Sequence, residues 1–254
     1  LEVAGVLHGQ ALDLDEAQRV RSLGWRGPIL LLEGCFEPRD LELCSRLDLW
    51  HTVHHEAQID MLAAHKTNAP HRVFLKMNSG MNRLGFRPSA YRGAWQRLSG
   101  LTQVDEITLM THFADADGAG GVAAQMAAFE AATRELPGER SVSNSAATLR
   151  FAGAQGEGAQ VAADWVRPGI LVYGSAPDYP AHDATGWDLQ PAMTLRAKLI
   201  ATQRIAEHAT TPEWLNKQNA ADVAGLFECL DRSAVGILDR LASAQRPALP
   251  GAAD

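Results

Sequence analysis

The stretch V-F-L-K-M-N-S-G-M-N-R-L-G-F, residues 73–86, decides how the rest of the chain is interpreted. It opens with an apolar run at residues 73–75 that is typical of a short buried strand, and at residues 78–80, Asn-Ser-Gly, it breaks into a turn. Lys76 and Arg83 flank that turn. Two cations at the end of a buried strand are costly unless an anion meets them, so we expect a site here; two solvated surface charges are the alternative.

The composition limits the classes of function. The 254 residues carry a net charge of -7, with 46% hydrophobic and 21% charged residues, as in an ordinary soluble globular protein. The acidic balance argues against a nucleic-acid partner, and no apolar run is long enough for a membrane span. The first residue is Leu1 and no signal-peptide pattern follows, so we expect a cytoplasmic chain that begins inside a longer protein.

The three cysteines, Cys35, Cys44 and Cys229, are widely spaced in the sequence and form no C-x-x-C pair. Neither a disulfide framework nor a zinc site is therefore expected, and free thiols in a cytoplasmic protein are the simplest interpretation.

Strand-like and helix-like segments alternate along the chain, which indicates βαβ units and a parallel sheet. No Gly-rich dinucleotide loop follows an early strand, so an α/β fold of the (β/α)8 TIM-barrel type is favoured over an open doubly wound sheet. We expect no strand within residues 1–11, which leaves the barrel incomplete at its first strand. The predicted strands are residues 28–32, 49–53, 73–76, 106–111, 141–143, 164–166 and 170–173, and the predicted helices are residues 15–23, 37–43, 56–65, 89–98, 122–136 and 146–151.

The character of the sequence changes after residue 205. Residues 206–244 contain a helix start at Thr211-Pro212 and apolar residues at helical spacing, which predicts a helical segment. Residues 245–254 are rich in Pro and Ala and are predicted to be a disordered tail. The expected division is therefore a partial barrel over residues 1–205, a helical segment and a tail.

In a TIM-type barrel the site lies at the carboxyl ends of the strands. The loop that begins at Asn144-Ser145 joins a strand to a helix, where free N–H groups and a hydroxyl favour a phosphate. The loop at residues 167–169 includes a glycine that lets the backbone approach a ligand closely. The residues expected at this face are Lys76, Arg83, His112, Asn144, Ser145, Arg167, Gly169 and Ile170.

Simpler interpretations remain open for several of these residues. Asn144 taken alone is more often a plain helix cap than a phosphate ligand, and His112 alone is more often a hydrogen-bonded core histidine. Asp115 and Asp117 have no second acidic cluster near them in the sequence and are interpreted as solvated loop carboxylates. No metal site is therefore expected.

Four motifs, taken in order, carry a resemblance to a known family: K-M-N-S-G-M-N-R-L-G-F (76–86), T-H-F-A-D-A-D (111–117), N-S-A-A (144–147) and D-W-V-R-P-G-I-L-V-Y-G (164–174). Their order and spacing resemble those of bacterial alanine racemases, over about residues 12–205. The resemblance implies an N-terminal (β/α)8 barrel, a C-terminal β domain, a homodimer and pyridoxal 5'-phosphate as cofactor. It also implies alanine as substrate, with its L and D forms interconverted for the cell wall or for catabolism.

The resemblance also implies roles for the two cations of the opening stretch. Arg83 is similar to the arginine that contacts the ring oxygen of the cofactor. Lys76 is similar to the lysine, carbamylated in many family members, that holds this arginine. Carbamylation replaces a cation by an anion and would resolve the unfavourable pairing of Lys76 with Arg83.

The remaining motifs match the other cofactor contacts of the family. Arg167 resembles the arginine at the ring nitrogen, and His112 resembles the histidine that packs on the ring and is bonded to that arginine. An arginine cannot readily give up a proton, so the ring nitrogen stays unprotonated and the cofactor becomes a weaker electron sink. Ser145, Gly169 and Ile170 match phosphate-binding positions.

Two catalytic residues of the family have no counterpart in a matching motif. The family's cofactor lysine lies in a K-A-N-A-Y-G-H-G-like motif, and its second base is a tyrosine of the C-terminal domain. We expect this chain alone to be inactive, or nearly so, as a racemase. The alternatives are a barrel that binds the cofactor or phosphate without racemising, and an unrelated barrel enzyme acting on a phosphorylated sugar or amine. The chain contains Lys66, Lys76, Lys198 and Lys217, and Tyr91, Tyr173 and Tyr179.

Overall fold

The computed structural model describes residues 9–11, 14–67, 69–151, 161 and 163–192. The chain divides into two compact units, Leu1–Pro168 and Gly169–Asp254, and each is described by itself. The predicted helical segment at 206–244 and the predicted tail at 245–254 lie outside the described residues. The predicted boundary at residue 205 also lies outside them and stays a prediction.

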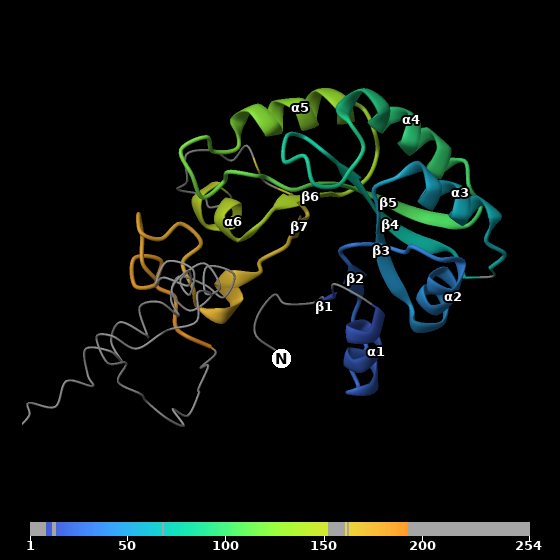
Figure 1. The fold of residues 1–254 in the computed structure, drawn as a ribbon, viewed down its shortest axis with the longest axis horizontal. Helices are drawn as coiled ribbons and strands as arrows, with labels where there is room; N and C mark the ends of the chain where they lie inside the picture. The colour runs from blue at the N-terminus through green and yellow to red at the C-terminus, as the bar shows by residue number, and fades with distance from the viewer. Residues whose placement is uncertain (1–8, 12–13, 68, 152–160, 162, 193–254) are drawn as a thin grey trace, which may run out of the picture. The chain divides into compact units, whose positions relative to one another are not determined.

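The first unit is built on a parallel sheet of seven strands that follow one another in chain order. Each strand from β1 to β6 is followed by a helix, and the sheet curves into an arc with α2 to α5 along its convex face (Figure 1). Over the described residues this parallel sheet and its helices form a half-barrel, which confirms the predicted α/β fold of the TIM-barrel type. The elements are β1 Gly9–Ala11, α1 Leu14–Ser22, β2 Ile29–Leu31, α2 Pro38–Leu47, β3 Leu49–Val53, α3 Glu56–Ala64, β4 His71–Met77, α4 Pro88–Ser99, β5 Val104–Thr111, α5 Ala123–Thr133, β6 Arg140–Ser143, α6 Ser145–Phe151 and β7 Trp165–Val166.

The strand β1 corrects the expectation that residues 1–11 contain no strand. Gly9 lies opposite Ile29 and Ala11 opposite Leu31 in a parallel pairing with β2. The tripeptide Gly-Gln-Ala has no β-branched or aromatic residue, so its own sequence does not indicate a strand. The pairing with a fully buried neighbour decides its conformation, and that neighbour is distant in sequence.

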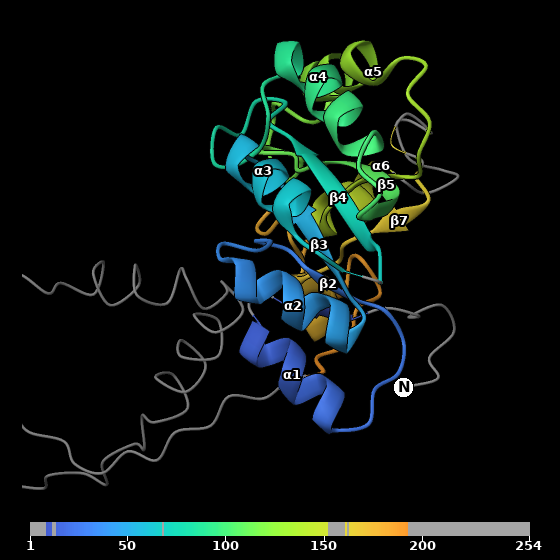
Figure 2. The same cartoon turned by 90° about the vertical axis from the view of Figure 1, so that its right-hand side faces the viewer.

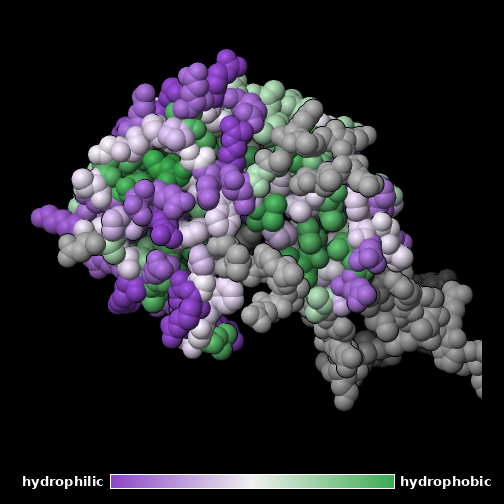
Figure 3. Space-filling view, turned by 180° about the vertical axis from the view of Figure 1, so that it is seen from behind, coloured by the Kyte–Doolittle hydropathy of each residue, from purple (hydrophilic) through white to green (hydrophobic). Residues whose placement is uncertain are grey.

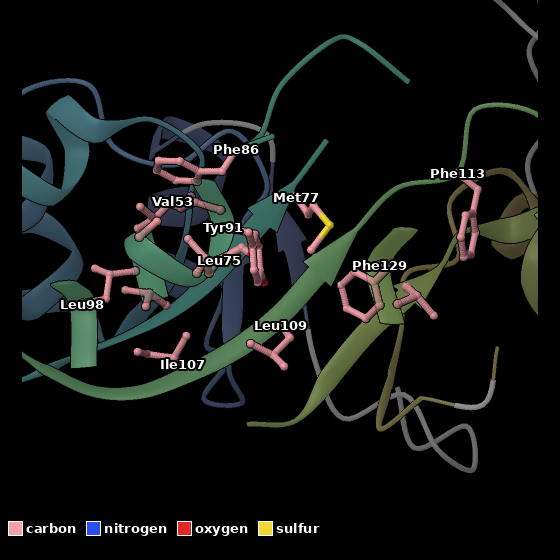
Figure 4. Packing of buried hydrophobic residues seen from close by; sticks show 14 of the residues in the cluster. Val53, Leu75, Met77, Phe86, Tyr91, Leu98, Ile107, Leu109, Phe113 and Phe129 are labelled. Atoms are coloured by element: carbon pink, nitrogen blue, oxygen red, sulfur yellow. The ribbon is translucent and has the colours of Figure 1, made fainter. Parts of the chain in front are cut away.

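One face of the sheet packs against the helices and forms the larger core. Side chains alternate between the two faces of a strand, so Leu75 and Met77 of β4 point to the same side as Leu109 of β5. Tyr91 of α4 meets them there and is fully buried (Figure 4). Its hydroxyl donates a 2.7 Å hydrogen bond to the carbonyl oxygen of Leu75, which satisfies the polar end of an otherwise apolar contact.

The other face of the sheet carries a smaller apolar group, here called the inner cluster. The ring centroid of Trp50 lies 6.0 Å from that of Phe74 and 5.6 Å from that of Trp165. Because side chains alternate, the next residue on this face after Phe74 is Lys76. The position two residues after Met110 is His112. The inner cluster consists of Leu30, Trp50, Phe74 and Met110, with Leu32 and Trp165 packed against it.

The outer layer of the first unit is formed by helices, of which α1, α2 and α4 are amphipathic. Figure 2 shows α1 and α2 side by side, in agreement with the contacts between them. The face seen in Figure 3 carries hydrophilic side chains along its upper edge, with hydrophobic side chains between them. Among the helices that the structure describes, none combines the length and the apolar character needed to cross a membrane.

The second unit corrects the prediction of a strand at residues 170–173. Ile170–Tyr173 forms a 3-10 helix, η2, in which the Val172 amide donates to the Gly169 carbonyl oxygen at 3.1 Å. Gly174 ends it at a φ of 82°, where an added Cβ would lie 2.0 Å from the carbonyl oxygen of Gln190. Four apolar residues in a row fit either a strand or a helical turn, and the glycine at the end decided the outcome here.

Candidate functional site

Lys76 is the centre of the candidate site in the first unit. It lies near the end of β4 on the inner face and is only 5% exposed. Burial, together with the positive charges of Arg83 and Arg167, lowers the pKa of Lys76 to about 8, and Glu33 opposes this shift. None of the ion pairs within the described residues includes Lys76. The expected cluster of cations at this strand end is therefore present.

The loop after β4 turns back onto its own strand and thereby presents Arg83. The Phe86 amide donates to the Lys76 carbonyl oxygen at 2.9 Å, and the Asn78 amide donates to the Phe86 carbonyl oxygen at 2.8 Å. Gly85 has a φ of 120°, and an added Cβ would lie 2.6 Å from the Asn78 nitrogen. The motif therefore needs glycine at this position to close the loop over Lys76.

Asparagine and hydroxyl side chains fix the same loop to the neighbouring strand. Asn78 Oδ1 accepts from the Asn82 amide at 2.9 Å, which stabilises the turn. The Ser79 and Thr111 hydroxyl groups are 2.7 Å apart, and Thr111 donates to the Met77 carbonyl oxygen at 3.0 Å. Through Thr111, the loop that carries Arg83 is tied to the end of β5.

Arg167 is a buried cation that follows β7. Its Nη1 donates to the carbonyl and hydroxyl oxygens of Ser141, each at 2.6 Å, and its Nη2 donates to the Thr111 carbonyl oxygen at 2.5 Å. Burial lowers the pKa of Arg167 to about 10, so the group stays charged at neutral pH. All of these acceptors are neutral, so the charge of Arg167 adds to the positive potential around Lys76.

His112 is held as a neutral imidazole by the same charges. Burial lowers its pKa to about 3, with further contributions from Arg167, Arg83 and Lys76. The resemblance implies a hydrogen bond between His112 and Arg167, and no such bond is present among the described residues. The charges of Arg167, Arg83 and Lys76 nevertheless act on His112 and, together with burial, keep it neutral.

Asn144 adopts the simpler of its two predicted roles. Its Oδ1 accepts from the Ala147 amide at 3.0 Å and its Nδ2 donates to the Phe113 carbonyl oxygen at 3.3 Å. Asn144 is therefore the N-cap of α6, and Ser145 is a buried residue in the first turn of that helix. Gly169 and Ile170 lie in the second unit, at the start of η2, so the first unit brings together only part of the predicted set.

Three residues of the site were not anticipated from the sequence. Ser141 and Thr111 supply acceptors for Arg167, and Glu33 is the acidic residue that raises the pKa of Lys76. A usable signal existed for Ser141 and Ser143, because polar residues at alternate positions of a fully buried strand must face something polar.

A cavity of about 400 Å³ opens beside Arg83. The loop after β2, the start of α3 and the loop after β4 form its walls. Among the described residues no group of three or more metal-ligating side chains is placed to hold a metal ion. The lining residues are Cys35, Phe36, His54, His55, Ala57, Gln58, Met61, Arg83, Leu84 and Gly85.

Sequence comparison places most of the chain within one family. The family described as "Alanine racemase, N-terminal domain" matches residues 2–177. An alanine racemase of Methylibium petroleiphilum is 73% identical over 192 residues, which are 76% of this chain and 51% of that protein. One from Albidiferax ferrireducens is 71% identical over 195 residues, covering 76% and 52%. The chain thus spans about half the length of these curated relatives.

Solved structures agree with the sequence comparison. The biosynthetic alanine racemase of Pseudomonas aeruginosa superposes with a TM-score of 0.65 at 36% identity, covering 72% of this chain and 49% of that one. A histidine racemase of Leuconostoc mesenteroides subsp. sake superposes with a TM-score of 0.57 at 28% identity, covering 67% and 46%.

Proposed function

We propose, from the premise that this chain belongs to the alanine racemase family, that its first unit holds pyridoxal 5'-phosphate in an enzyme that interconverts L- and D-alanine. One observation carries this proposal most strongly. Lys76, Arg83 and Arg167 gather around a neutral His112, and none of the three forms an ion pair within the described residues. Positive charge of this kind, much of it buried, favours an anionic ligand.

The residues present suit a cofactor that is anionic at both its phosphate and its ring oxygen. Arg83 would bind the ring oxygen, Arg167 would face the ring nitrogen and His112 would pack on the ring. Ser145 of the first unit would donate to the phosphate, and Gly169 and Ile170 remain phosphate-binding candidates by the family resemblance alone. Pyridoxal phosphate, when bound, withdraws electrons from the α-carbon of the amino acid, and the protein orients the substrate and sets the local charge.

Arg167 would limit how strongly the ring nitrogen is protonated. Burial lowers its pKa only to about 10, so it stays charged at neutral pH, and its Nη1 and Nη2 groups donate to Ser141 and Thr111. A guanidinium fixed in this way cannot pass a proton to a ring nitrogen. We infer that Arg167 leaves the ring nitrogen unprotonated and thereby makes the cofactor a weaker electron sink.

Lys76 would act as a carbamate. With a pKa lowered to about 8, a useful fraction of the amine is uncharged near that pH. The free amine attacks carbon dioxide, a proton is released, and the side chain becomes an anion. That anion would pair with Arg83 and fix its position, so that a repulsive contact becomes an attractive one.

The proton-moving residues are the part of the site that these 254 residues do not supply in a matching motif. Among Lys66, Lys76, Lys198 and Lys217, none lies in the sequence context of the family's cofactor lysine. We therefore propose that this chain positions the cofactor and does not racemise alanine by itself. The same proposal includes a homodimer, which is expected from the family resemblance.

The test titrates the purified full chain with pyridoxal phosphate, follows the absorbance of the bound cofactor and then reduces with borohydride. We expect saturable binding that inorganic phosphate competes away. Arg83→Gln should weaken binding by about tenfold or more, since a charge-assisted contact is lost. Arg87→Gln is the matched control, because Arg87 is exposed and lies outside the cation cluster. Equal binding by both variants would refute the assignment of Arg83.

Racemisation of alanine by the same preparation separates the two remaining alternatives. No rate above that of free pyridoxal phosphate is expected. A clear rate, with a stable reduced adduct on one lysine, would show instead that the chain is a complete catalyst. Saturable binding of inorganic phosphate without any affinity for pyridoxal would favour an unrelated phosphate-binding barrel.

A further inference from the structure

Cys35 and Cys44 form a buried pair of free thiols that the proposed function does not use. Their Sγ atoms are 3.4 Å apart, and each residue is 1% exposed. Cys35 lies in the loop that follows β2 and Cys44 lies within α2. No pairing was expected from the sequence, in which nine positions separate them. Both are free thiols, as expected, and the turn into α2 brings them together.

Neighbouring side chains hold the two thiols in this arrangement. Asp40 of α2 accepts hydrogen bonds at Oδ2 from the Phe36 amide, at 2.8 Å, and from the Glu37 amide, at 2.9 Å. The loop that carries Cys35 is thereby fixed to the helix that carries Cys44. On the other side, Gln58 Nε2 donates to the Cys35 carbonyl oxygen at 3.1 Å. These hydrogen bonds fix the loop that carries Cys35 against α2, and the short distance between the two sulfur atoms follows from that arrangement.

The two buried cysteines differ in their position relative to the cavity of about 400 Å³ beside Arg83. Cys35 is one of the residues that line it, and Cys44 is not. A small solute in that cavity therefore lies nearer to Cys35. The Sγ atom of Cys44 lies 3.4 Å from that of Cys35, close enough to act as the resolving thiol.

We propose that Cys35 and Cys44 are a modification site at which a hydroperoxide oxidises the two thiols to an intrachain disulfide. In the first step the sulfur of Cys35 attacks one oxygen of hydrogen peroxide, the O–O bond breaks, and the thiol proton leaves with the other oxygen as water. In the second step the sulfur of Cys44 attacks the sulfur of Cys35–SOH, the S–O bond breaks, and a second water leaves. Two thiols lose two electrons and one peroxide gains them.

Oxidation of this pair affects the cavity because Cys35 is part of its wall. A disulfide draws the sulfur atoms from 3.4 Å to about 2 Å, so Cys35 moves toward α2. Its carbonyl oxygen holds Gln58, and Gln58 Oε1 accepts from the amides of His54 and His55 at the start of α3. Oxidation would therefore shift the wall that faces Arg83.

The rate should depend on pH. The hydrogen bond between the Cys35 thiol and Cys44, together with burial, raises the pKa of Cys35, and the thiolate is the nucleophile. Oxidation at neutral pH is expected to be slow and to accelerate as the pH rises. The pair therefore responds to sustained oxidant, and this inference does not depend on any racemase activity.

The experiment treats the native full chain with hydrogen peroxide and then alkylates it under denaturing conditions before peptide mass mapping. The expected result is one linked peptide pair containing Cys35 and Cys44, a loss of two hydrogen atoms, and a loss of two alkylatable thiols that a reductant restores. Cys229→Ser removes the third thiol and should leave this result unchanged.

The single variants test the order of the two steps. Cys44→Ser should accumulate a sulfenic acid at Cys35, which dimedone traps, whereas Cys35→Ser should leave Cys44 unmodified. A native chain in which both thiols stay alkylatable would overturn the proposal, as would over-oxidation of Cys35 without any linked peptide. Peptide mapping of the unaltered chain distinguishes these outcomes even if a variant fails to fold.

Discussion

Arg167 lies buried against Ser141 and donates to both its carbonyl and its hydroxyl oxygen, each at 2.6 Å. Ser141 lies in β6, and Arg167, 26 positions later in the sequence, directly follows the neighbouring strand β7. A buried guanidinium that rests on neutral acceptors keeps its charge available for a ligand. The strength of this anchor can be measured through the stability of the fold.

Removal of the Ser141 hydroxyl should destabilise the fold more than removal of its neighbour on the same face. Ser141→Ala deletes a hydrogen bond to a buried cation, which we expect to lower the free energy of unfolding by about 2 kcal/mol. Ser143→Ala deletes a neutral hydrogen bond to the Val161 carbonyl oxygen and should cost about 1 kcal/mol. Urea unfolding measures both. Equal losses would show that the charge of Arg167 does not strengthen the bond.

The loop that presents Arg83 should tolerate no side chain at Gly85. Gly85→Ala places a Cβ 2.6 Å from the Asn78 nitrogen and 2.7 Å from the Met77 carbonyl carbon, so we expect a loss of a few kcal/mol and weaker binding of pyridoxal phosphate. Gly93→Ala is the matched control. Gly93 lies inside α4 with nothing within 4 Å of an added Cβ, so the variant should be neutral or more stable by up to about 1 kcal/mol. The opposite ranking in thermal unfolding would contradict the proposed role of Gly85.

Lys76 should carry a carbamate, and Lys66 should not. At a fixed concentration of dissolved carbon dioxide, the uncharged fraction of Lys76 grows as the pH rises through about 8, so the carbamate signal should grow with it. Carbon-13-labelled carbon dioxide and NMR detect the adduct, which should disappear in Lys76→Arg. Lys66 is exposed and serves as the internal control. A signal that survives Lys76→Arg would assign the adduct to another amine.

A buried histidine group should make the fold sensitive to acid. His51 Nε2 is 3.3 Å from His71 Nδ1, His71 Nε2 is 3.3 Å from Ser45 Oγ, and the ring of His65 lies 5.2 Å from that of His71. Burial, and then repulsion from the neighbouring histidines, lowers the pKa of His51 to about 3 and that of His71 to about 4. His51 Nδ1 and His65 Nε2 are buried without a hydrogen-bond partner, so this group accommodates a proton poorly.

The direction of the pH effect follows from these lowered pKa values. Well above pH 6.5, His51 and His71 are neutral in both the folded and the unfolded chain, and their contribution to stability is complete. As the pH falls below 6.5 the unfolded chain takes up protons on both residues, while the folded chain protonates His71 only near pH 4 and His51 only near pH 3. Between these values each residue removes up to about 1.4 kcal/mol per pH unit. His71→Asn should show a shallower decline over this range than the parent, while Ser45→Ala, which keeps all three histidines, should not. Chemical unfolding at each pH measures the free energy of unfolding. If this free energy declines in parallel in the parent chain and in His71→Asn, His71 does not cause the sensitivity to acid.

The local pattern of the chain predicted most of the elements. The predicted strand at 49–53 matches Leu49–Val53, and the loop residues Lys76 and Arg83 occupy the strand end where they were expected. Each of these features is encoded within a few neighbouring residues, because an apolar run followed by turn residues can adopt few conformations other than a strand and a turn. The prediction for residues 170–173 was wrong for the same reason, since a run of four apolar residues fits two conformations.

Long-range contacts account for what was missed. Gly9–Ala11 becomes a strand only because β2 lies beside it, and Ser141 becomes part of the site only because Arg167 follows β7. Asn144 could be a cap or an anion ligand by sequence, and its bond to the Ala147 amide shows a cap.

The sequence by itself thus determined the alternation of strands and helices, the parallel partial barrel and the strand end at which Lys76 and Arg83 stand, because periodicity and turn chemistry are encoded within a few residues. Only the tertiary structure decided that Arg167 is anchored on Ser141, that burial and the charges of three cations keep His112 neutral, and that Cys35 meets Cys44. Charge interactions and thiol contacts depend on distance in space and on burial, and both are set by the packing of segments that are remote in the sequence.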